Sequence, residues 1–277
     1  MKRIHFKPLF LIAGSLLILS SCYKRFDPAT YQPPLDIGGY TSASQIASSS
    51  LIGLWSFEGG LKDSVSGNTL TNTGTAFSTG LKGQGMQGAL NSYALTTPSA
   101  AVANMQSFTI AYWVNSPAPS NGIIGLVNLA KTDGFWGNID MFFENGSTND
   151  NGKFRAHVTN GATEAWTTKD GITKLFDKWN HIALTYDAAS ETFKLFVNGS
   201  AIVTNPVPGF GPIHFTNLGG LVFGCVQFQT TPSQTSSTGS QPWASYLTGR
   251  LDEVRIYDKA LSDAELSALV LLEGRGK

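Results

Sequence analysis

The sequence predicts an all-β fold in which two antiparallel sheets pack against each other. From Leu51 almost to the end of the 277 residues, short segments of alternating apolar and polar residues are separated by Gly, Asn, Asp and Pro. Such a pattern is typical of a β-sandwich. Two Asn-Gly pairs lie between strand-like segments, and no long amphipathic helix interrupts the series. A chain of this length can bury one large core, and we assign residues 51–273 to a single domain.

The N-terminus has the features of a targeting segment rather than of the fold. Basic residues precede an apolar stretch at residues 9–19, which is too short to span a membrane and is typical of a signal peptide. It ends in Leu-Ser-Ser-Cys at Cys22, which resembles a bacterial lipobox, where the cysteine is acylated after cleavage. We therefore predict a lipoprotein signal peptide at residues 1–21 and lipidation of Cys22. The alternative is a plain secretory signal with an incidental cysteine.

Residues 22–50 are predicted to be the lipidated cysteine and a flexible tether between membrane and domain. They are rich in Pro, Ser and Ala and have no sustained periodicity, which is typical of a linker. Lipidation of Cys22 leaves Cys225, the other of the two cysteines, unpaired, so no disulfide framework is expected. Cys225 lies in an apolar run and is interpreted as a small core residue.

The strand-like segments follow the tether in regular order. They lie at residues 52–58, 108–114, 123–129, 140–144, 154–159, 164–168, 179–186, 192–197, 201–204, 221–228 and 247–257. The Asn-Gly pairs at residues 160–161 and 198–199 accept the positive φ of tight turns, so each predicts a β-hairpin. After the last segment, Ser262 and Glu265 form a capping-box pattern that predicts a short C-terminal helix.

The last strand, GRLDEVRIYDKA at residues 249–260, contains one unexpected carboxylate. Strict alternation places Asp252 on the same face as the apolar Val254 and Ile256. A carboxylate on a core face is costly unless backbone N–H groups, a cation or a metal compensates it. The position therefore requires a partner for Asp252.

Several segments resemble the signature strands of bacterial laminin G-like domains. They are FTIAYWV at residues 108–114, KWNHIALTYD at 178–187 and KLFVNG at 194–199, with LWSFE at 54–58 and the segment at 249–257 similar to the family's opening and closing strands. The resemblance covers about residues 51–273 and implies a concanavalin A-like jelly roll with adjacent first and last strands. That fold hosts lectins, adhesion modules, carbohydrate-binding modules and some glycosidases, so the site must decide the function.

The resemblance also implies a structural calcium ion. It brings the loop after the opening strand close to Asp252, so that Asp63, Asp252 and Glu58 could supply oxygen ligands together with backbone carbonyls. The alternative is that Asp252 accepts backbone N–H groups and that Asp63 is a solvated loop residue.

A carbohydrate site is predicted around residues 136–144. Alternation places Trp136, Asn138, Asp140 and Phe142 on one face, a row suited to stacking on a sugar and hydrogen-bonding it. We expect Trp166, Trp243 and Tyr246 to join this row. The alternative is that Trp136 and Phe142 belong to the core or its rim. The tryptophans of the signature strands are assigned to packing.

Catalysis is not expected from these residues. Some glycosidases of the superfamily resemble a Glu-x-Asp-x-(x)-Glu pattern on one strand, but Asn138 stands at the first position and Glu144 lies four residues past Asp140. No Ser–His–Asp or Cys–His arrangement is evident, and no clustered His or Cys suggests zinc. With 19 basic and 19 acidic residues, the chain has no cationic surplus for nucleic acid.

The sequence therefore favours a lipid-anchored, non-catalytic binding module of a Gram-negative, Bacteroidetes-type envelope. The expected location is the outer membrane, facing the periplasm or the cell surface, with the membrane contacted through the lipid anchor. Carbohydrate is the favoured ligand. A protein-binding adhesin and an accessory subunit of an envelope complex are the alternatives, and a glycoside hydrolase is the least favoured.

Overall fold

Strands dominate residues 35–277, the part of the chain that the structure, a computed structural model, describes. The predicted signal peptide, Cys22 and tether residues 23–34 lie outside it. In chain order the strands are β1 (Leu51–Trp55), β2 (Thr71–Thr73), β3 (Ala76–Thr79), β4 (Gln84–Gln87), β5 (Tyr93–Thr96), β6 (Phe108–Asn115), β7 (Ile123–Gly125), β8 (Val127–Lys131), β9 (Ile139–Phe143), β10 (Gly152–Asn160), β11 (Thr163–Ile172), β12 (Asn180–Asp187), β13 (Thr192–Val197), β14 (Ser200–Pro206), β15 (Leu218–Phe223), β16 (Ala244–Ser245) and β17 (Arg250–Tyr257). The helical elements are η1 (Ala43–Gln45), η2 (Ser48–Ser50), α2 (Ala100–Ala103), η3 (Gln227–Gln229) and α3 (Asp263–Glu273).

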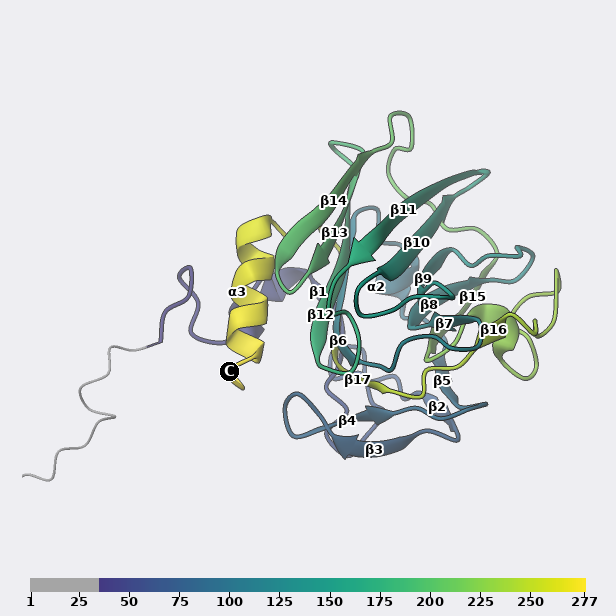
Figure 1. The fold of residues 1–277 in the computed structure, drawn as a ribbon. Coiled ribbons are helices and arrows are strands. Elements are labelled where there is room, and N and C mark those ends of the chain that lie inside the picture. The colour runs from purple at the N-terminus through teal and green to yellow at the C-terminus, as the bar shows by residue number, and fades with distance from the viewer. Residues whose placement is uncertain (1–34) are drawn as a thin grey trace, which may run out of the picture. The chain divides into compact units, whose positions relative to one another are not determined.

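The strands form two curled sheets that pack face to face (Figure 1). One runs β14-β13-β12-β6-β17-β4-β3, with β1 also paired to β17, and the other runs β11-β10-β9-β8-β15-β5-β2, with β7 and β16 attached through β9. Pairing is antiparallel except between β7 and β16. Because β1 pairs with β17, the first and last strands are adjacent. The predicted jelly-roll sandwich is confirmed.

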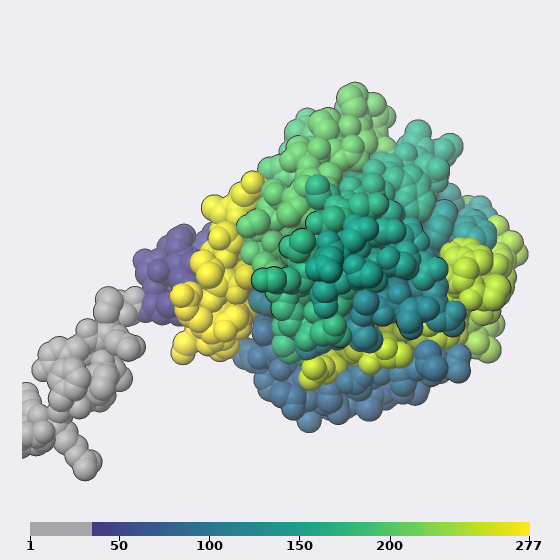
Figure 2. Space-filling view, viewed as in Figure 1, coloured from purple at the N-terminus to yellow at the C-terminus, as the bar shows by residue number. Residues whose placement is uncertain are grey.

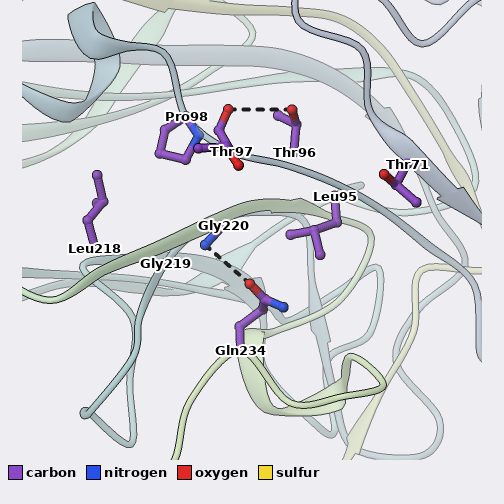
Figure 3. A pocket seen from close by; sticks show the side chains of 9 residues that line it. All are labelled: Thr71, Leu95, Thr96, Thr97, Pro98, Leu218, Gly219, Gly220 and Gln234. Carbon is purple, nitrogen blue, oxygen red and sulfur yellow. Dashed lines mark hydrogen bonds between the residues drawn. The ribbon is translucent and has the colours of Figure 1, made fainter.

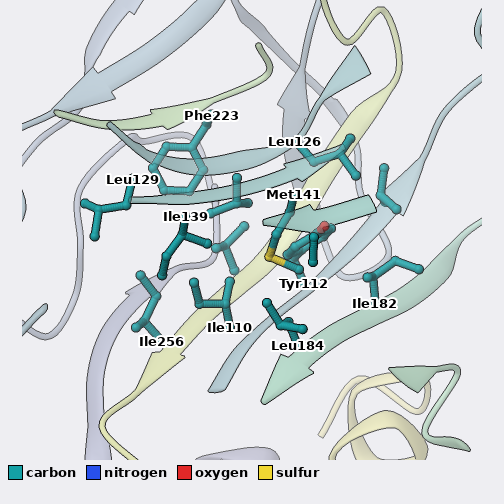
Figure 4. Packing of buried hydrophobic residues seen from close by; sticks show 14 of the residues in the cluster. Ile110, Tyr112, Leu126, Leu129, Ile139, Met141, Ile182, Leu184, Phe223 and Ile256 are labelled. Carbon is teal, nitrogen blue, oxygen red and sulfur yellow. The ribbon is translucent and has the colours of Figure 1, made fainter. Parts of the chain in front are cut away.

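The core fills the space between the two sheets. Apolar side chains from both inner faces are almost inaccessible to solvent, and Figure 4 shows a group of them. Those from the sheet of β17 include Ile110, Ile182, Leu184 and Ile256, and those from the other sheet include Leu129, Ile139, Met141 and Phe223. Alternating residues of each strand supply this face, as the period of two in the sequence predicts.

Both predicted hairpins and the predicted C-terminal helix are confirmed. Gly161, with φ +61°, lies in the turn between β10 and β11, and Asn198 and Gly199 both have positive φ between β13 and β14. Helix α3 starts at the Ser262 N-cap, whose side chain and Glu265 form the expected capping box. None of the helices in the described residues is long and apolar enough to cross a membrane.

Two regions differ from the sequence-based expectation. Strands β2 to β5 were not predicted, because they are only three or four residues long and β2 reads Thr-Asn-Thr with little burial. The last part of the predicted tether belongs to the fold, since Asp36–Lys277 form one compact unit. Ala43 and Ile46 are buried there, and the Ala43 N–H donates to the carbonyl of Lys277.

A β-bulge in β17 changes the face on which Asp252 lies. Glu253 has a φ of +46°, and the register with β6 shifts between Asp252 and Arg255. Leu251 therefore joins the core together with Val254 and Ile256. Asp252 lies opposite Trp113 of β6, which is outside the core cluster, and directly paired residues share a face. The prediction that Asp252 points with the apolar pair is wrong, because the extra residue interrupts the alternation.

A buried ionic network holds α3 on the outer face of the same sheet. Arg255 donates from Nε to Glu273 Oε1 (2.6 Å) and from Nη2 to Glu253 Oε2 (2.7 Å). Trp113 Nε1 donates to the other oxygen of Glu273 at 2.7 Å. Burial raises the pKa of Glu273 to about 7 although Arg255 opposes the shift. The helix end is thus fixed to the sheet by paired charges.

Candidate functional site

Four aromatic side chains form a partly exposed surface on the outer face of the sheet that contains β9, β10 and β11. Phe135 is 38% exposed, Trp243 is 40% exposed, and Trp136 and Trp166 are half-buried. These four residues are called the aromatic surface. Trp136 and Trp166 pack against a small buried apolar cluster, which consists of Ile123, Phe142, Val226, Phe228 and Ala244.

The rings reach this surface from distant parts of the chain. Trp136, in the loop before β9, stacks on Phe142 with centroids 5.3 Å apart and meets Trp166 of β11 edge-on at 5.4 Å. Trp243, just before β16, stacks with Phe135 at 6.1 Å and contacts Phe228 of η3 at 5.4 Å. The contacts hold each ring in place, so the surface is set before any ligand arrives.

The structure brings together three residues that the sequence placed in the carbohydrate site: Trp136, Trp166 and Trp243. Sequence reasoning missed Phe135 and Phe228. Phe135 directly precedes Trp136, so its position next to the row was an available signal. Phe228 was assigned to a strand, but that strand ends at Phe223 and a 3-10 turn presents Phe228 instead.

Asn138 is buried and has a structural role. Its Nδ2 donates to the carbonyls of Ala130 (3.0 Å) and Thr216 (3.1 Å), and its Oδ1 accepts from the Thr159 hydroxyl at 3.0 Å. The amide has no exposed atom left for a ligand. This corrects the expectation that Asn138 contacts a sugar directly.

Asp140 is also buried, but it connects to the surface through a histidine. Asp140 Oδ2 accepts from the Gly137 N–H (2.7 Å) and lies 3.1 Å from His157 Nδ1. His157 Nε2 lies 3.0 Å from Oε2 of Glu164, whose side chain is 61% exposed. Since Asp140 itself is inaccessible to solvent, the expected direct ligand contact is replaced by an indirect connection.

The strand register explains why these residues meet. His157 of β10 pairs with Asp140 of β9 on one side and with Trp166 of β11 on the other, so the three form a row across the sheet. The His157 ring lies 4.5 Å from the Trp166 ring. Burial lowers the pKa of His157, but its contacts with Asp140 and Glu164 outweigh burial and leave it raised. No local sequence pattern indicates this row, because its members lie on three different strands.

The next row along the same face is a set of ion pairs. Arg155 lies 3.3 Å from Glu144 through Nε and 2.6 Å from Asp170 through Nη1. Glu144 is partly buried where it pairs with Arg155. It is the residue that would have to act as the acid in the glycosidase pattern. The guanidinium is thus shared between two carboxylates.

Asp63 stabilises a local turn. Its Oδ1 accepts from the N–H groups of Leu54 (2.8 Å) and Val65 (2.9 Å), and Oδ2 accepts from the Ser66 hydroxyl. The side chain is buried, which corrects the alternative that it is solvated. These donors satisfy both oxygens locally.

Glu58 and Asp252 approach a different loop, at residues 80–84. Asp252 Oδ2 accepts from the N–H groups of Leu81 (2.7 Å) and Lys82 (3.1 Å), and Glu58 Oε2 accepts from Gln84 N–H (3.2 Å). A Cβ at Gly83, where φ is +54°, would lie 2.2 Å from Glu58 Oε2. The positive φ and the close approach of Glu58 therefore favour glycine at position 83.

The three carboxylates do not fit one calcium site. Asp63 is engaged at its own turn, and N–H groups, which suit a carboxylate rather than a cation, point at Asp252. Within residues 35–277, no group of three or more His, Cys, Asp or Glu is arranged to hold a metal. The partner that Asp252 requires is the backbone of residues 81 and 82. Calcium binding itself stays a prediction of the resemblance.

One hollow in the described residues is lined by none of the aromatic surface. It has a volume of about 430 Å³ and opens between β5, β15 and β2, where the Gly220 N–H donates to Gln234 Oε1 at 3.3 Å (Figure 3). No charged residue lines it, and it contains none of the predicted site residues. We therefore do not assign the site to this hollow.

The chain belongs to the concanavalin A-like lectin/glucanases superfamily, whose family profile matches residues 88–267. Among solved structures, it is similar to the ligand-binding domain of botulinum neurotoxin serotype D in complex with N-acetylneuraminic acid, at 12% identity and a TM-score of 0.59, covering 83% of this chain and 52% of that one. It is also similar to the binding domain of a paraclostridial mosquitocidal protein, at 18% identity and a TM-score of 0.57, covering 80% and 52%.

A third similar structure is domain 4 of an extracellular GH43 arabinanase from Geobacillus stearothermophilus, in complex with arabinotriose. The identity is 18% and the TM-score 0.53, covering 80% of this chain and 98% of that one. The chain spans about half the length of the two toxin domains. At these identities the likeness shows the fold alone. No protein with a curated description matches the chain.

Proposed function

We propose that this protein is a non-catalytic glycan-binding module that a lipid anchor displays at the outer membrane. The aromatic surface is the observation that carries the proposal. Aromatic rings held in fixed positions stack on the apolar faces of sugars at little entropic cost. Phe135 and Trp243 offer exposed ring area, and the packed rings of Trp136 and Trp166 extend it.

Two of the structurally similar domains support carbohydrate as the ligand class. One was solved with N-acetylneuraminic acid and one with arabinotriose. The first is described as a ligand-binding domain and the second as one domain of an arabinanase. This support is an analogy of fold, so the aromatic surface carries the proposal.

The carboxylates near the aromatic surface support a non-catalytic role. An acid–base pair of a glycosidase must reach the scissile bond. Asp140 is inaccessible to solvent, Glu144 is paired with Arg155, and Asn138 occupies the position of a third carboxylate.

The place where the chain enters the fold supports display from a lipid anchor. Residues 36–50 pack beside α3, while β16, which directly follows Trp243, lies at the other side of the domain (Figure 1). In the space-filling view, the segment between η3 and β16 forms a lobe across the molecule from α3 (Figure 2). A module attached through residue 36 would leave the aromatic surface free.

A glycan array with the purified protein tests the proposal. We expect Trp243→Ala and Trp166→Ala each to weaken binding by about tenfold or more, because each removes a stacking ring. Trp179→Ala is the matched control. Trp179 is a half-buried tryptophan that stacks with Arg250 elsewhere in the fold, so its loss should leave the affinity unchanged.

The proposal fails if no glycan binds, or if the two substitutions affect binding no more than the control does. The protein partner left open by the sequence then becomes the better hypothesis. Pull-down from envelope extracts would test it.

A further inference from the structure

Glu164 is the exposed polar side chain that directly adjoins the aromatic surface. It lies two residues before Trp166 on β11 and therefore on the same face of the strand. Its carboxylate contacts the His157 ring, which itself packs against Trp166. On its other side opens a hollow of about 310 Å³ between the β10–β11 hairpin and residues 207–210, where Glu164 is the one charged residue among those that line it.

The buried Asp140–His157 pair fixes where this carboxylate sits. His157 has an oxygen of Asp140 3.1 Å from Nδ1 and an oxygen of Glu164 3.0 Å from Nε2. Two acceptors around one ring require a proton on Nε2 and a second proton between Nδ1 and Asp140. Whichever of these two groups holds that second proton, Nε2–H donates to Glu164, and the three side chains together carry one negative charge.

Arg155, two residues from His157 on β10, does not offset that negative charge, because its guanidinium is shared between Glu144 and Asp170. Lys131, the cation near the β10–β11 turn, donates from Nζ to the carbonyl of Gly161 at 3.5 Å. The groups that pack on His157 from neighbouring strands are Asp140 on β9 and Glu164 on β11, and its aromatic neighbours, Trp136 and Trp166, are uncharged. A ligand on the aromatic surface therefore meets a carboxylate that only accepts hydrogen bonds.

We propose that Glu164 is the polar anchor of the glycan site and that it selects neutral, hydroxyl-bearing sugars over carboxylated ones. The inference rests on the proposed function. Sugar hydroxyls donate to a carboxylate, and a charged acceptor makes the stronger bond. A sialic or uronic acid would bring a like charge to the same place, which penalises the wrong ligand. His157 is the positioning residue, since it acts on the ligand through Glu164.

The test uses the purified full chain and an array of neutral oligosaccharides, each paired with the same oligosaccharide extended by a sialic or uronic acid. We expect each neutral member to bind about tenfold more tightly than its carboxylated counterpart. Glu164→Gln keeps the size and removes the charge, so the preference should shrink to about threefold or less. Asp170→Asn, which removes a carboxylate on the same face beyond Arg155, should keep the preference.

The outcomes separate the two proposals. If carboxylated glycans bind as tightly as neutral ones and Trp243→Ala still weakens binding by about tenfold or more, the glycan-binding function stands and the role of Glu164 is overturned. The same conclusion follows if Glu164→Gln keeps the full preference. If nothing on the array binds, the proposed function itself fails.

A pH titration tests the positioning role of His157. Loss of the shared proton leaves one N–H for two carboxylates, and the buried Asp140 retains it because it has no access to water. Affinity for a neutral glycan should therefore fall as the pH rises through the raised pKa of His157. Glu164→Ala, an exposed substitution, should bind about tenfold more weakly and with a flat profile. Equal pH profiles for the wild type and Glu164→Ala would overturn the positioning role.

Discussion

His181 is a fully buried histidine without a hydrogen-bond partner on either ring nitrogen. It packs edge-on against Trp113 with centroids 5.3 Å apart. Burial and the charge of Arg255 lower its pKa to about 3, whereas an exposed histidine in the unfolded chain has a pKa of about 6.5. The folded protein therefore holds a neutral ring at a pH where the unfolded chain binds a proton.

This difference predicts a pH dependence of stability. The contribution of His181 is fully present above about pH 6.5 and is lost as the pH falls towards 3, because the unfolded state binds the proton first. Between pH 6.5 and pH 5 it should lower the free energy of unfolding by about 2 kcal/mol. In His181→Phe, which keeps an aromatic ring, this contribution is absent.

Urea unfolding of both proteins across this pH range provides the measurement. The difference between their unfolding free energies isolates His181, because Asp252 and Glu273, whose raised pKa values act in the opposite direction, are present in both. His214→Gln removes an exposed histidine and serves as the control. A difference that stays constant from pH 6.5 to pH 5 would contradict the prediction.

At the scale of elements, the sequence predicts what depends on local pattern. Most strands that form the core have apolar residues at alternate positions, and the Asn-Gly turns and the Ser262 capping box act within a few residues, so these elements follow from the chain alone. Strands β2 to β5 are too short and polar for that pattern. The bulge at Glu253 is equally hard to predict from the sequence, because glutamate rarely adopts the positive φ that this position has.

The candidate site is likewise only partly predictable from the sequence. The alternation in residues 136–144 indicates the face, and the tryptophans on it are visible in the sequence. The connection from Asp140 to Glu164 depends on the register of three strands, which sequence alone does not specify. His157 has no recognisable motif, so its role emerges only when β9, β10 and β11 are aligned.

The bulge also determines which groups surround the Asp252 carboxylate. It directs the carboxylate to the loop at residues 80–84, where burial raises its pKa to about 7 although backbone N–H groups oppose the shift. Since those N–H groups already satisfy Asp252, we expect neither EDTA nor added Ca²⁺ to change the melting temperature. A rise in melting temperature with Ca²⁺ that Asp252→Asn abolishes would show instead that the carboxylate binds the ion.

At the scale of the whole molecule, the point where the chain enters the fold and the aromatic surface are well separated. The polypeptide enters beside η1 and α3, where the Ala43 N–H donates to the carbonyl of Lys277. Strand β16, which directly follows Trp243 of the aromatic surface, lies across the domain from α3 (Figure 1). An object attached near η1 should therefore leave ligand access unchanged, whereas one attached near β16 should block it.

Site-specific labelling measures this arrangement directly. Ser44, in η1, and Ser240, three residues before Trp243, are both exposed, so Ser44→Cys and Ser240→Cys form a matched pair in a Cys22→Ser background. Cys225 does not compete for the label, because it is buried and burial raises the pKa of its thiol. Each variant is conjugated to a large polyethylene glycol and assayed against the same neutral glycan.

We expect the conjugate at residue 240 to lose glycan binding by about tenfold or more, since the polymer covers the approach to Trp243 and Phe135 and stacking needs close contact. The conjugate at residue 44 should bind as the unlabelled protein does. If both conjugates bind normally, ligand contact occurs elsewhere on the domain. If both lose binding equally, the two regions are not independent, and attachment through the N-terminus would interfere with the function that we propose.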